Sequence, residues 1–467
     1  MIETIPTLDL TRSRAQFPAL AQTVNAHPAV FFDGPGGTQV PQRVIDAISG
    51  YLGHDNANSG GAYATSRRTD AVIGEARAAM ADFLHCQADE VMFGLNMTQL
   101  TFAMSRAIGR ELKAGDEIVV TRLDHDANVS PWLAMAEERG VTVSWAEIHD
   151  EDCTLDMADL AAKINSKTKL VAAGYASNAV GTINPVKEIV GLAHAAGALA
   201  YIDAVHYGPH GLIDVAALDC DFLVCSTYKF FGPHMGVLFG KREHLLRMRP
   251  YKVRPLTDAI PFRWEFGTLN HECIAGITAA VDYFADLGRQ TLLGKTTSSE
   301  ETMRVPHSTR FSLSGGFGGN NEEDRLPHPS ASFAESRISE RRASIVAAHA
   351  AIHEHERALL ERMMTGLRQI PKLKIYGITD PARFDERCST LAVRIEDGNP
   401  QHYPLPLATK LGERGFFTWD GNYYALNLTE HLDVEKTGGF LRIGLVHYNT
   451  LEEVDRFLAA LREIAGV

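Results

Sequence analysis

The sequence predicts an α/β protein: a large domain with a mostly parallel seven-stranded sheet, and a smaller α/β domain after it. Between residues 67 and 290, short apolar runs alternate with segments whose apolar residues recur at helical spacing. Repeated strand–helix units of this kind form parallel sheets covered by helices on both faces. The length of 467 residues, too long for one small domain, leaves room for the second domain.

Each expected strand is a short apolar run within the region 67–290. The seven runs are 91–93, 118–121, 141–145, 170–174, 199–202, 222–225 and 237–239. Amphipathic helices lie between several of them; one carries Leu100, Ala103, Met104, Ala107 and Ile108 on a single face. Ligands of such sheets bind at the carboxyl ends of the strands, so the residues that follow each strand are the candidates for chemistry.

Composition divides the chain into four parts. Residues 1–66 are expected to contribute to the small domain and to the entrance of the active site, with a helix from Gln39 that presents Val44, Ile45, Ile48 and Leu52. Residues 67–290 form the large ligand-binding domain, and 341–467 form the small one. The part between them, 291–340, is rich in Ser, Gly, Pro and charge, which is typical of an insertion or linker; a surface loop and a lid both fit it.

Charge and cysteine content exclude several classes of function. The formal net charge is -13, without basic runs, which argues against a general nucleic-acid or anionic-membrane surface. The six cysteines are scattered, as expected for reduced thiols in a cytoplasmic protein. The N-terminus lacks the pattern of a signal peptide, and no run of eighteen apolar residues predicts a membrane span.

Lys229 lies in a short polar segment between two apolar strands, in DFLVCSTYKFFGPHMGVLFG. Partial burial between strands lowers the pKa of a lysine and makes its amine a nucleophile, as cofactor attachment requires. The alternative is a lysine whose stem packs on apolar surface while its amine reaches water. Asp203 ends another apolar strand, where a buried carboxylate needs a cationic partner. A lysine for an aldehyde and an acid for a ring nitrogen together predict pyridoxal phosphate.

Other strand ends and one loop carry polar or flexible residues that fit the same site. Asn96 and Thr98 begin a helix whose free N–H groups can bind phosphate, although a plain helix cap explains them equally. His125 can stack on a flat ring or lie on the surface, and Asn178 fits an ordinary turn. In the loop DGPGG, Gly36 and Gly37 permit close approach of a ligand, or form a simple turn. The helical pair His349 and His353 is typical of a solvated face, so no metal site is expected.

The motifs DHDANVSPW, SNAVGTINPV, YIDAVH, CSTYKFFGP, EFGTLN and LRIGLVHYNT follow one another along the chain. In this order the sequence resembles the class V aminotransferase family of fold-type I pyridoxal phosphate enzymes, and within it the cysteine desulfurase and selenocysteine lyase branch. The resemblance covers nearly the whole chain apart from 291–340. It implies an enzyme that acts on an amino acid as its small-molecule substrate and works as a homodimer with shared active sites.

The resemblance also implies a role for individual residues. Lys229 would hold the cofactor, Asp203 would pair with its ring nitrogen and His125 would stack on the ring. The remaining cofactor-binding residues would be Asn96, Met97, Thr98, Asn178, His206, Ser226 and Tyr228, with Thr268 reaching across from a second subunit. Arg442 would bind the substrate carboxylate through its bidentate fork. Gly36, Gly37 and Tyr424 complete the expected substrate-binding residues.

Two departures from the family pattern bear on the reaction. Tyr228 stands directly before the lysine, where the family usually has histidine. The loop FTWDGNYYALNLTEHL contains Tyr423 and Tyr424 but no cysteine, where desulfurases carry a nucleophilic thiol; the nearest cysteine, Cys388, is far upstream. The sequence therefore predicts a lyase that breaks a C–S bond of a cysteine-type substrate by β-elimination. The alternatives are an aminotransferase, an epimerase, a desulfurase with another sulfur acceptor, and a non-catalytic binding module.

Overall fold

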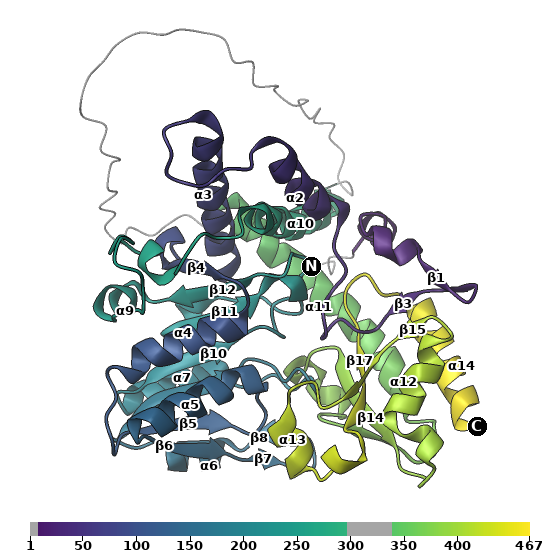
Figure 1. Cartoon of the computed structure of the whole chain (residues 1–467). Coiled ribbons are helices and arrows are strands. Elements are labelled where there is room, and N and C mark those ends of the chain that lie inside the picture. Colours follow the sequence, from purple (N-terminus) through teal and green to yellow (C-terminus); the bar gives the residue numbers. More distant parts are fainter. Residues whose placement is uncertain (1–7, 297–338) are drawn as a thin grey trace.

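A seven-stranded sheet forms the centre of the larger part of the molecule in the computed structural model, which describes residues 8–296 and 339–467 (Figure 1). The strand order is β4-β12-β11-β10-β9-β5-β6. The strands are β4 Val91–Gly94, β5 Glu117–Thr121, β6 Thr142–Ala146, β9 Thr168–Gly174, β10 Leu199–Asp203, β11 Phe222–Ser226 and β12 Gly236–Gly240. All seven expected strands are present, each within two residues of its predicted bounds.

The sheet is mostly parallel, as predicted. Four neighbouring pairs run parallel, from β11 through β10, β9 and β5 to β6. Only β12 runs in the opposite direction, pairing antiparallel with both β11 and β4. The carboxyl ends of the six other strands therefore meet at one edge of the sheet.

Helices cover both faces of this sheet because successive side chains of each strand point to opposite faces, and in these strands the side chains on both faces are apolar. Val119 and Val171 belong to one core cluster, which includes residues of α3 and α10. Ile118 and Leu170, their neighbours in the strands, belong to the cluster on the other face, with residues of α4 and α5. The bounds of these helices are α3 Ala64–Leu84, α4 Met97–Gly109, α5 Ser130–Arg139, α7 Val186–Ala195 and α10 His271–Thr296.

A smaller α/β unit forms the C-terminal part, as the sequence predicts. Its antiparallel sheet has the order β13-β14-β17-β16, with bounds β13 Leu373–Tyr376, β14 Thr390–Ile395, β16 Trp419–Gly421 and β17 Phe440–Gly444. One face of this sheet packs on helices through its own core cluster. The helices are α11 Glu340–Leu367, α12 Pro404–Gly412 and α14 Leu451–Ala465.

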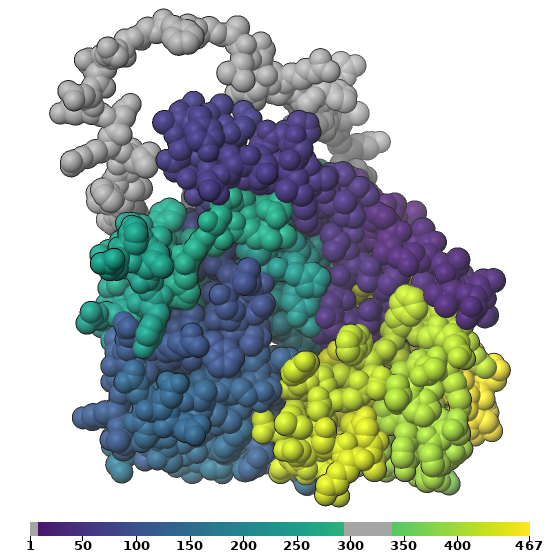
Figure 2. All heavy atoms as spheres, in the orientation of Figure 1, coloured from purple at the N-terminus to yellow at the C-terminus, as the bar shows by residue number. Residues whose placement is uncertain are grey.

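The N-terminal segment lies against the C-terminal unit (Figure 2). Strand β3 (Val30–Phe31) pairs parallel with β15 (Phe416–Phe417), and Asp33 bridges to Gly444 of β17. Helix α2 (Gln42–His54) then packs on α10. The predicted apolar face of α2 is only partly right, because Val44 is buried but Ile45 and Leu52 are exposed; the helix packs through the side that carries Val44 and Tyr51.

The remaining elements are short. They are α1 Leu10–Arg14, β1 Thr23–Val24, β2 His27–Pro28, β7 Ile148–His149, β8 Thr154–Leu155, α6 Met157–Lys163, α8 Val215–Leu218, α9 Arg242–Arg247 and α13 Leu426–His431. Most of the expected insertion 291–340 lies outside the described residues, between the end of α10 and the start of α11. Among the helices described, none combines the length and the apolar character that a bilayer crossing requires.

Candidate active site

The residues that follow the strands meet at the carboxyl edge of the large sheet. Lys229 ends the short turn Thr227–Lys229 directly after β11, and its Nζ donates a hydrogen bond to the carbonyl of Pro35. Both the backbone N–H and the Oγ1 of Thr38 donate to the carbonyl of Tyr228, each over 3.1 Å. The N-terminal loop therefore holds the lysine in place. Burial, reinforced by the positive charge of Arg442, lowers the pKa of Lys229 to about 7.

Asp203 is the last residue of β10, adjacent to β11 in the sheet. Its side chain is buried and accepts a hydrogen bond from the Val205 N–H over 2.9 Å. Burial raises the pKa of Asp203 to about 6, and the positive charge of Lys229 opposes that rise. Among the described residues, no cationic side chain forms an ion pair with this carboxylate, and a protonated ring nitrogen would supply that partner.

His125 caps the turn Asp126–Asn128 that follows β5. Its Nδ1 accepts a hydrogen bond from the Ala127 N–H over 3.0 Å, and its ring stacks on Tyr424 with the centroids 5.4 Å apart and the planes at 23°. Burial and the charges of Lys229 and Arg442 lower the pKa of His125 to about 4. The ring is therefore neutral at physiological pH and suited to stacking on a flat partner.

Arg442 reaches this edge from β17 of the C-terminal unit. One of its guanidinium nitrogens donates to the carbonyl of Asn178 over 2.9 Å, and the guanidinium lies 4.1 Å from the ring centroid of Tyr423. Asn178 in turn donates from Nδ2 to the carbonyl of Tyr423 over 2.8 Å. Burial lowers the pKa of Arg442 to about 10, which leaves it charged at neutral pH. The loop after β9, the loop that contains Tyr423 and Tyr424 (the tyrosine loop) and β17 are thus joined at one point.

The expected phosphate site lies at the start of α4, after β4. Asn96 caps the helix by accepting from the Gln99 N–H over 2.8 Å, Met97 is buried and Thr98 is exposed. The structure thus confirms the helix start, and it also bears out the plain helix cap as one role of Asn96. Free N–H groups of this helical turn remain available to an anion.

Several buried polar atoms at this edge have no partner in the part of the chain that the structure describes. They are Ser226 Oγ, Asn178 Oδ1, Arg442 Nε and both ring nitrogens of His206. A buried polar atom without a hydrogen bond costs about 1–3 kcal/mol, so such a set indicates a ligand. A phosphate, a ring hydroxyl and a carboxylate match the chemistry of these donors and acceptors, and pyridoxal phosphate with an amino acid carries all three.

Gly36 and Gly37 lie close to aromatic side chains. A Cβ on Gly36 would be 2.8 Å from Nε1 of Trp419, and one on Gly37 would be 3.3 Å from the Tyr228 ring. The loop therefore requires glycine at position 36 because an indole occupies the space. Trp419 and Asp33 are neighbours of the site that the sequence did not single out. Asp33 Oδ1 is buried without a partner, and burial raises the pKa of Asp33 to about 6; its position directly before the GPGG loop was the available signal.

Tyr228 lies at the site, beside Gly37 and with its ring centroid 4.9 Å from the Lys229 Nζ, whereas Thr268 does not reach the site within one chain. The Tyr228 ring stacks on His234, with the centroids 4.7 Å apart and the planes at 14°. Thr268 is exposed on the segment before α10. Their contacts with the cofactor stay predictions, as does that of His206.

The helical histidines of α11 point in different directions. The predicted solvated face is wrong for His349, which is buried and stacks on Phe284, with the centroids 5.0 Å apart. His353 lies 3.3 Å from Asp385 in an ion pair, and His355 contacts the carbonyl of Asn449 over 2.9 Å. The three side chains therefore do not converge on one point.

Comparison with known proteins identifies the family. The model of the class V aminotransferases matches residues 30–304 and 345–457. The chain belongs to the class V aminotransferase family. The resemblance predicted from the motifs is confirmed, and with it a fold-type I enzyme that depends on pyridoxal phosphate.

Relatives within this family extend over the whole length of the chain. A cysteine desulfurase from Pectobacterium atrosepticum is 29% identical over 472 residues, and one from Serratia proteamaculans is 30% identical over 471; each match covers 97% of this chain and 98% of the relative. The solved structure of a cysteine desulfurase from Thermococcus onnurineus superimposes with a TM-score of 0.78 at 23% identity, over 98% of both chains. One from Escherichia coli gives 0.75 at 22% identity, also over 98% of both. These structural likenesses confirm the fold.

Proposed function

We propose that the protein is a pyridoxal-phosphate-dependent lyase that breaks the C–S bond of a cysteine-type amino acid by β-elimination. The family and the cofactor support an amino acid as substrate, and the relatives named cysteine desulfurase support a sulfur-bearing one. The observation that carries the proposal is the tyrosine loop, in which Tyr424 stacks on His125 and no cysteine is present.

The residues at the sheet edge divide the work of holding the cofactor and substrate. Lys229 would attach the cofactor, Asp203 would pair with its ring nitrogen, and the start of α4 with Ser226 would bind its phosphate. Bound pyridoxal phosphate supplies an aldehyde for the substrate amine and a ring that delocalises negative charge from Cα. Arg442 would bind the substrate carboxylate, with the loop at Gly36 and Gly37 closing over it.

Lys229 then acts on the substrate. With a pKa of about 7, a large fraction of its side chain is a neutral amine at physiological pH, so Nζ can take the proton from Cα. The electron pair left at Cα forms a double bond with Cβ as the Cβ–S bond breaks, and sulfur leaves with that bonding pair. Tyr424, 70% exposed as a residue, would protonate the leaving sulfur through its hydroxyl.

We find no cysteine on the described loop that contains Tyr423 and Tyr424, where the desulfurases carry their sulfur-accepting thiol. Cys388 is the last cysteine of the sequence, and its sulfur lies in a buried cluster with His206 and His210. Sulfur therefore departs as a free thiol or sulfide. The balance is one cysteine-type substrate and one water, giving one thiol, one pyruvate and one ammonia.

Product analysis tests this reaction. The holoenzyme is incubated with cysteine, cystine and an S-aryl cysteine conjugate, and pyruvate, alanine and free thiol are measured. We expect pyruvate and thiol in equal amounts from at least one substrate, and none from the Lys229→Ala variant. Alanine without pyruvate would instead show a desulfurase with another acceptor, and no product from any substrate would contradict the proposal.

We also propose that the protein is cytoplasmic, since none of the six cysteines is in a disulfide. We further propose that it is a homodimer whose second subunit completes the site, since Asn96 and Thr98 at the phosphate site are exposed within one chain. A hollow of about 440 Å³ next to the phosphate site is lined by Asn96, Thr98, Gln99, Phe102, Ala103, Arg106 and Phe266. Thr268 lies two residues from Phe266, so a partner's Thr268 segment is suited to cover it. Mixing inactive Lys229→Ala chains with Thr268→Asp chains should restore part of the activity, because one site of the mixed dimer keeps both native residues; light scattering gives the oligomeric state.

A further inference from the structure

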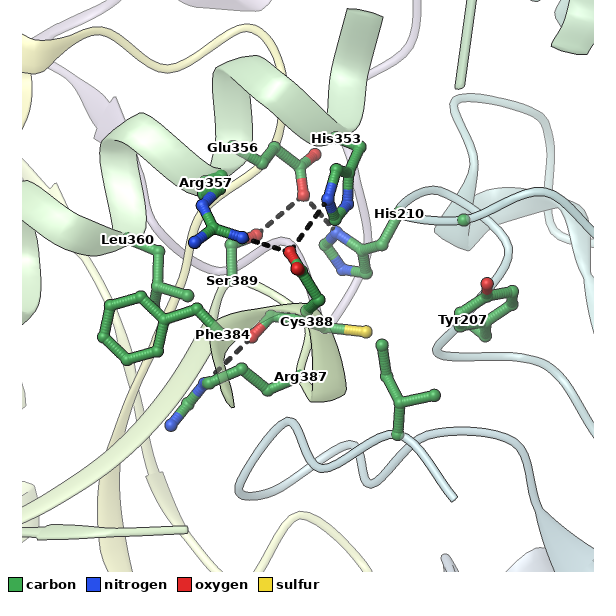
Figure 3. Close-up of a pocket in the computed structure, with 13 residues that line it drawn as sticks. Tyr207, His210, His353, Glu356, Arg357, Leu360, Phe384, Arg387, Cys388 and Ser389 are labelled. Carbon is green, nitrogen blue, oxygen red and sulfur yellow. Dashed lines mark hydrogen bonds and ion pairs between the residues drawn. The ribbon is translucent and has the colours of Figure 1, made fainter. Parts of the chain in front are cut away.

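Three ligand-type side chains meet behind the proposed active site, where the two units of the molecule join. His206 and His210 follow β10 in the large unit, and Cys388 precedes β14 in the small one. One ligand atom from each lies within 4.8 Å of the others, and the residues are 4%, 6% and 3% exposed. Figure 3 shows His210 and Cys388 on the wall of the adjoining cavity.

The protonation of His210 is set by a neighbouring carboxylate. Its Nδ1 lies 2.6 Å from Oε2 of Glu356, and the same oxygen accepts a hydrogen bond from Ser389 over 2.8 Å (Figure 3). Nδ1 therefore carries the proton, and the lone pair of Nε2 points away from Glu356. A carboxylate behind a histidine is the usual second layer of a metal site, where it orients the ring and increases its basicity.

The polar atoms that face the cluster lack partners among the described residues. They are His206 Nδ1, His206 Nε2 and His210 Nε2. Burying such an atom without a hydrogen-bond partner is unfavourable, and a bound cation would remove that cost. Two imidazole nitrogens that are both hydrogen-bond acceptors cannot form a hydrogen bond with each other, whereas both can bind one metal ion.

A cavity of about 120 Å³ gives access to the cluster. His210, Glu356, Cys388 and Ser389 line its inner part, and its outer part is formed by His353, Arg357 and Asp385 at the surface (Figure 3). Asp385 forms ion pairs with both Arg357 and His353. The cavity has room for an ion and water.

We propose that His206, His210 and Cys388 form a binding site for a zinc ion. Two imidazoles and a thiolate are ligands that Zn²⁺ prefers, and water supplies the fourth position. Tetrahedral zinc places such atoms roughly 3.3–3.6 Å apart, so the side chains close by about 1 Å on binding. Zinc uses one nitrogen of His206 and leaves the other free for the cofactor. The site joins the two units, and it does not depend on the proposed reaction.

Metal analysis of the holoenzyme tests the site. The protein is treated with a chelator, loaded with zinc chloride and desalted, and zinc is measured per chain. We expect one zinc ion per chain in the wild type, none in Cys388→Ala, and one in the control Cys153→Ala, which removes a different buried thiol. Equal zinc in all three proteins would place the metal elsewhere and overturn the proposal, as would its absence from the wild type.

X-ray absorption at the zinc edge gives a second measurement that needs no variant. We expect one sulfur and two imidazole nitrogens around zinc in the wild-type holoenzyme, with oxygen in the remaining position. His210→Gln should lose zinc while its visible cofactor absorbance stays. A spectrum without sulfur, or with several, would contradict the assignment even if Cys388→Ala did not fold.

Discussion

Lys229 lies among opposing charges. Burial and Arg442 lower its pKa, while the carboxylates of Asp203 and Asp33 raise it, and the balance gives about 7. The amine is therefore close to half protonated at neutral pH. A group in this state can both attack an aldehyde and carry a proton, which are the two tasks that the proposed reaction assigns to it.

Replacing Lys229 with alanine should remove the visible absorbance of the covalently bound cofactor, because Nζ is the group that attaches it. Turnover should fall by about 10²- to 10⁴-fold or more, since the same atom moves the Cα proton. Absorbance and product formation are measured on the same preparation. Activity that persists in Lys229→Ala would place the chemistry on another residue.

Cofactor capture by the apoenzyme should depend on pH through the same amine. Only neutral lysine attacks the aldehyde, so the rate should rise as pH increases through about 7 and level off above it. Arg442→Met removes a positive charge that lowers this pKa, so its midpoint should move to higher pH. Arg394→Met, which removes another arginine of the small sheet, should leave the midpoint unchanged; equal shifts in both variants would refute the assignment.

Tyr424→Cys should place a thiol on the loop beside His125. Sulfur would then have an acceptor, and cysteine would give alanine and a persulfide on residue 424 in addition to pyruvate. Tyr424→Phe, which adds no thiol, should form no persulfide and should release the thiol more slowly if the hydroxyl protonates it. Mass spectrometry of the intact protein detects the added sulfur, and its absence would show that position 424 does not reach the leaving group.

Residues whose side chains take part in the proposed chemistry were predictable from the sequence, while the residues that pack against them in space were not. Lys229, Asp203, His125 and Arg442 carry charge or a ring at recognisable positions, and the structure brings them to one edge. Trp419 was missed because its contact with Gly36 joins residues distant in sequence, and a pattern along the chain does not report such a distance. The buried cluster at Cys388 was missed for the same reason.

Asp124 shows how an element is held in place by a single side chain. Its carboxylate accepts hydrogen bonds from Thr121 Oγ1 over 3.0 Å, the Gly174 N–H over 2.7 Å and Asn128 Nδ2 over 2.9 Å. These groups belong to the end of β5, the end of β9 and the turn after His125. The position of the His125 turn therefore depends on a buried residue that the cofactor does not need to touch.

Asp124→Ala should lower the free energy of unfolding by about 3 kcal/mol, because several buried donors lose their acceptor. Cofactor affinity should fall as well, since the His125 turn is no longer fixed to β9. Asp126→Ala is the matched control. Among the described residues its partly exposed carboxylate accepts a hydrogen bond only from Ser130, and water can replace that bond, so the change should be below about 1 kcal/mol. Urea unfolding measures both, and equal losses would contradict the role of Asp124.

At the level of elements, strands were predicted better than the faces of helices. Apolar runs located each strand of the large sheet within two residues, because a strand buried on both faces leaves a continuous signal. The buried face of helix α2 was predicted less accurately. Its apolar residues spread over a wide arc, and the helix that packs against it, α10, decides which of them are buried.

Arg387 connects the two units of the whole molecule. It is buried, and its guanidinium donates to the carbonyls of Val180 in the large unit and of Ile378, Cys388 and Thr390 in the small one. The orientation of the two units, and hence the reach of Arg442 to Asn178, depends on this contact.

Arg387→Met should lower the free energy of unfolding by about 3 kcal/mol or more, because several buried carbonyls lose a charged donor. Arg383→Met, four residues earlier, breaks only surface ion pairs with Asp152 and Glu386 and should cost below about 1 kcal/mol. Thermal and urea unfolding compare the two. A larger effect at Arg383 would show that the surface pairs, rather than the buried guanidinium, join the units.

The parallel pairing of β3 with β15 has a consequence for biosynthesis. Val30 and Phe31 are synthesised 386 residues before their partners Phe416 and Phe417. At about 5–20 residues per second, the early strand waits roughly 20–80 s with its apolar side chains and backbone edge uncovered. During that interval nascent chains on one messenger can pair with each other, so shielding of residues 30–31 by a chaperone should govern the yield of soluble protein.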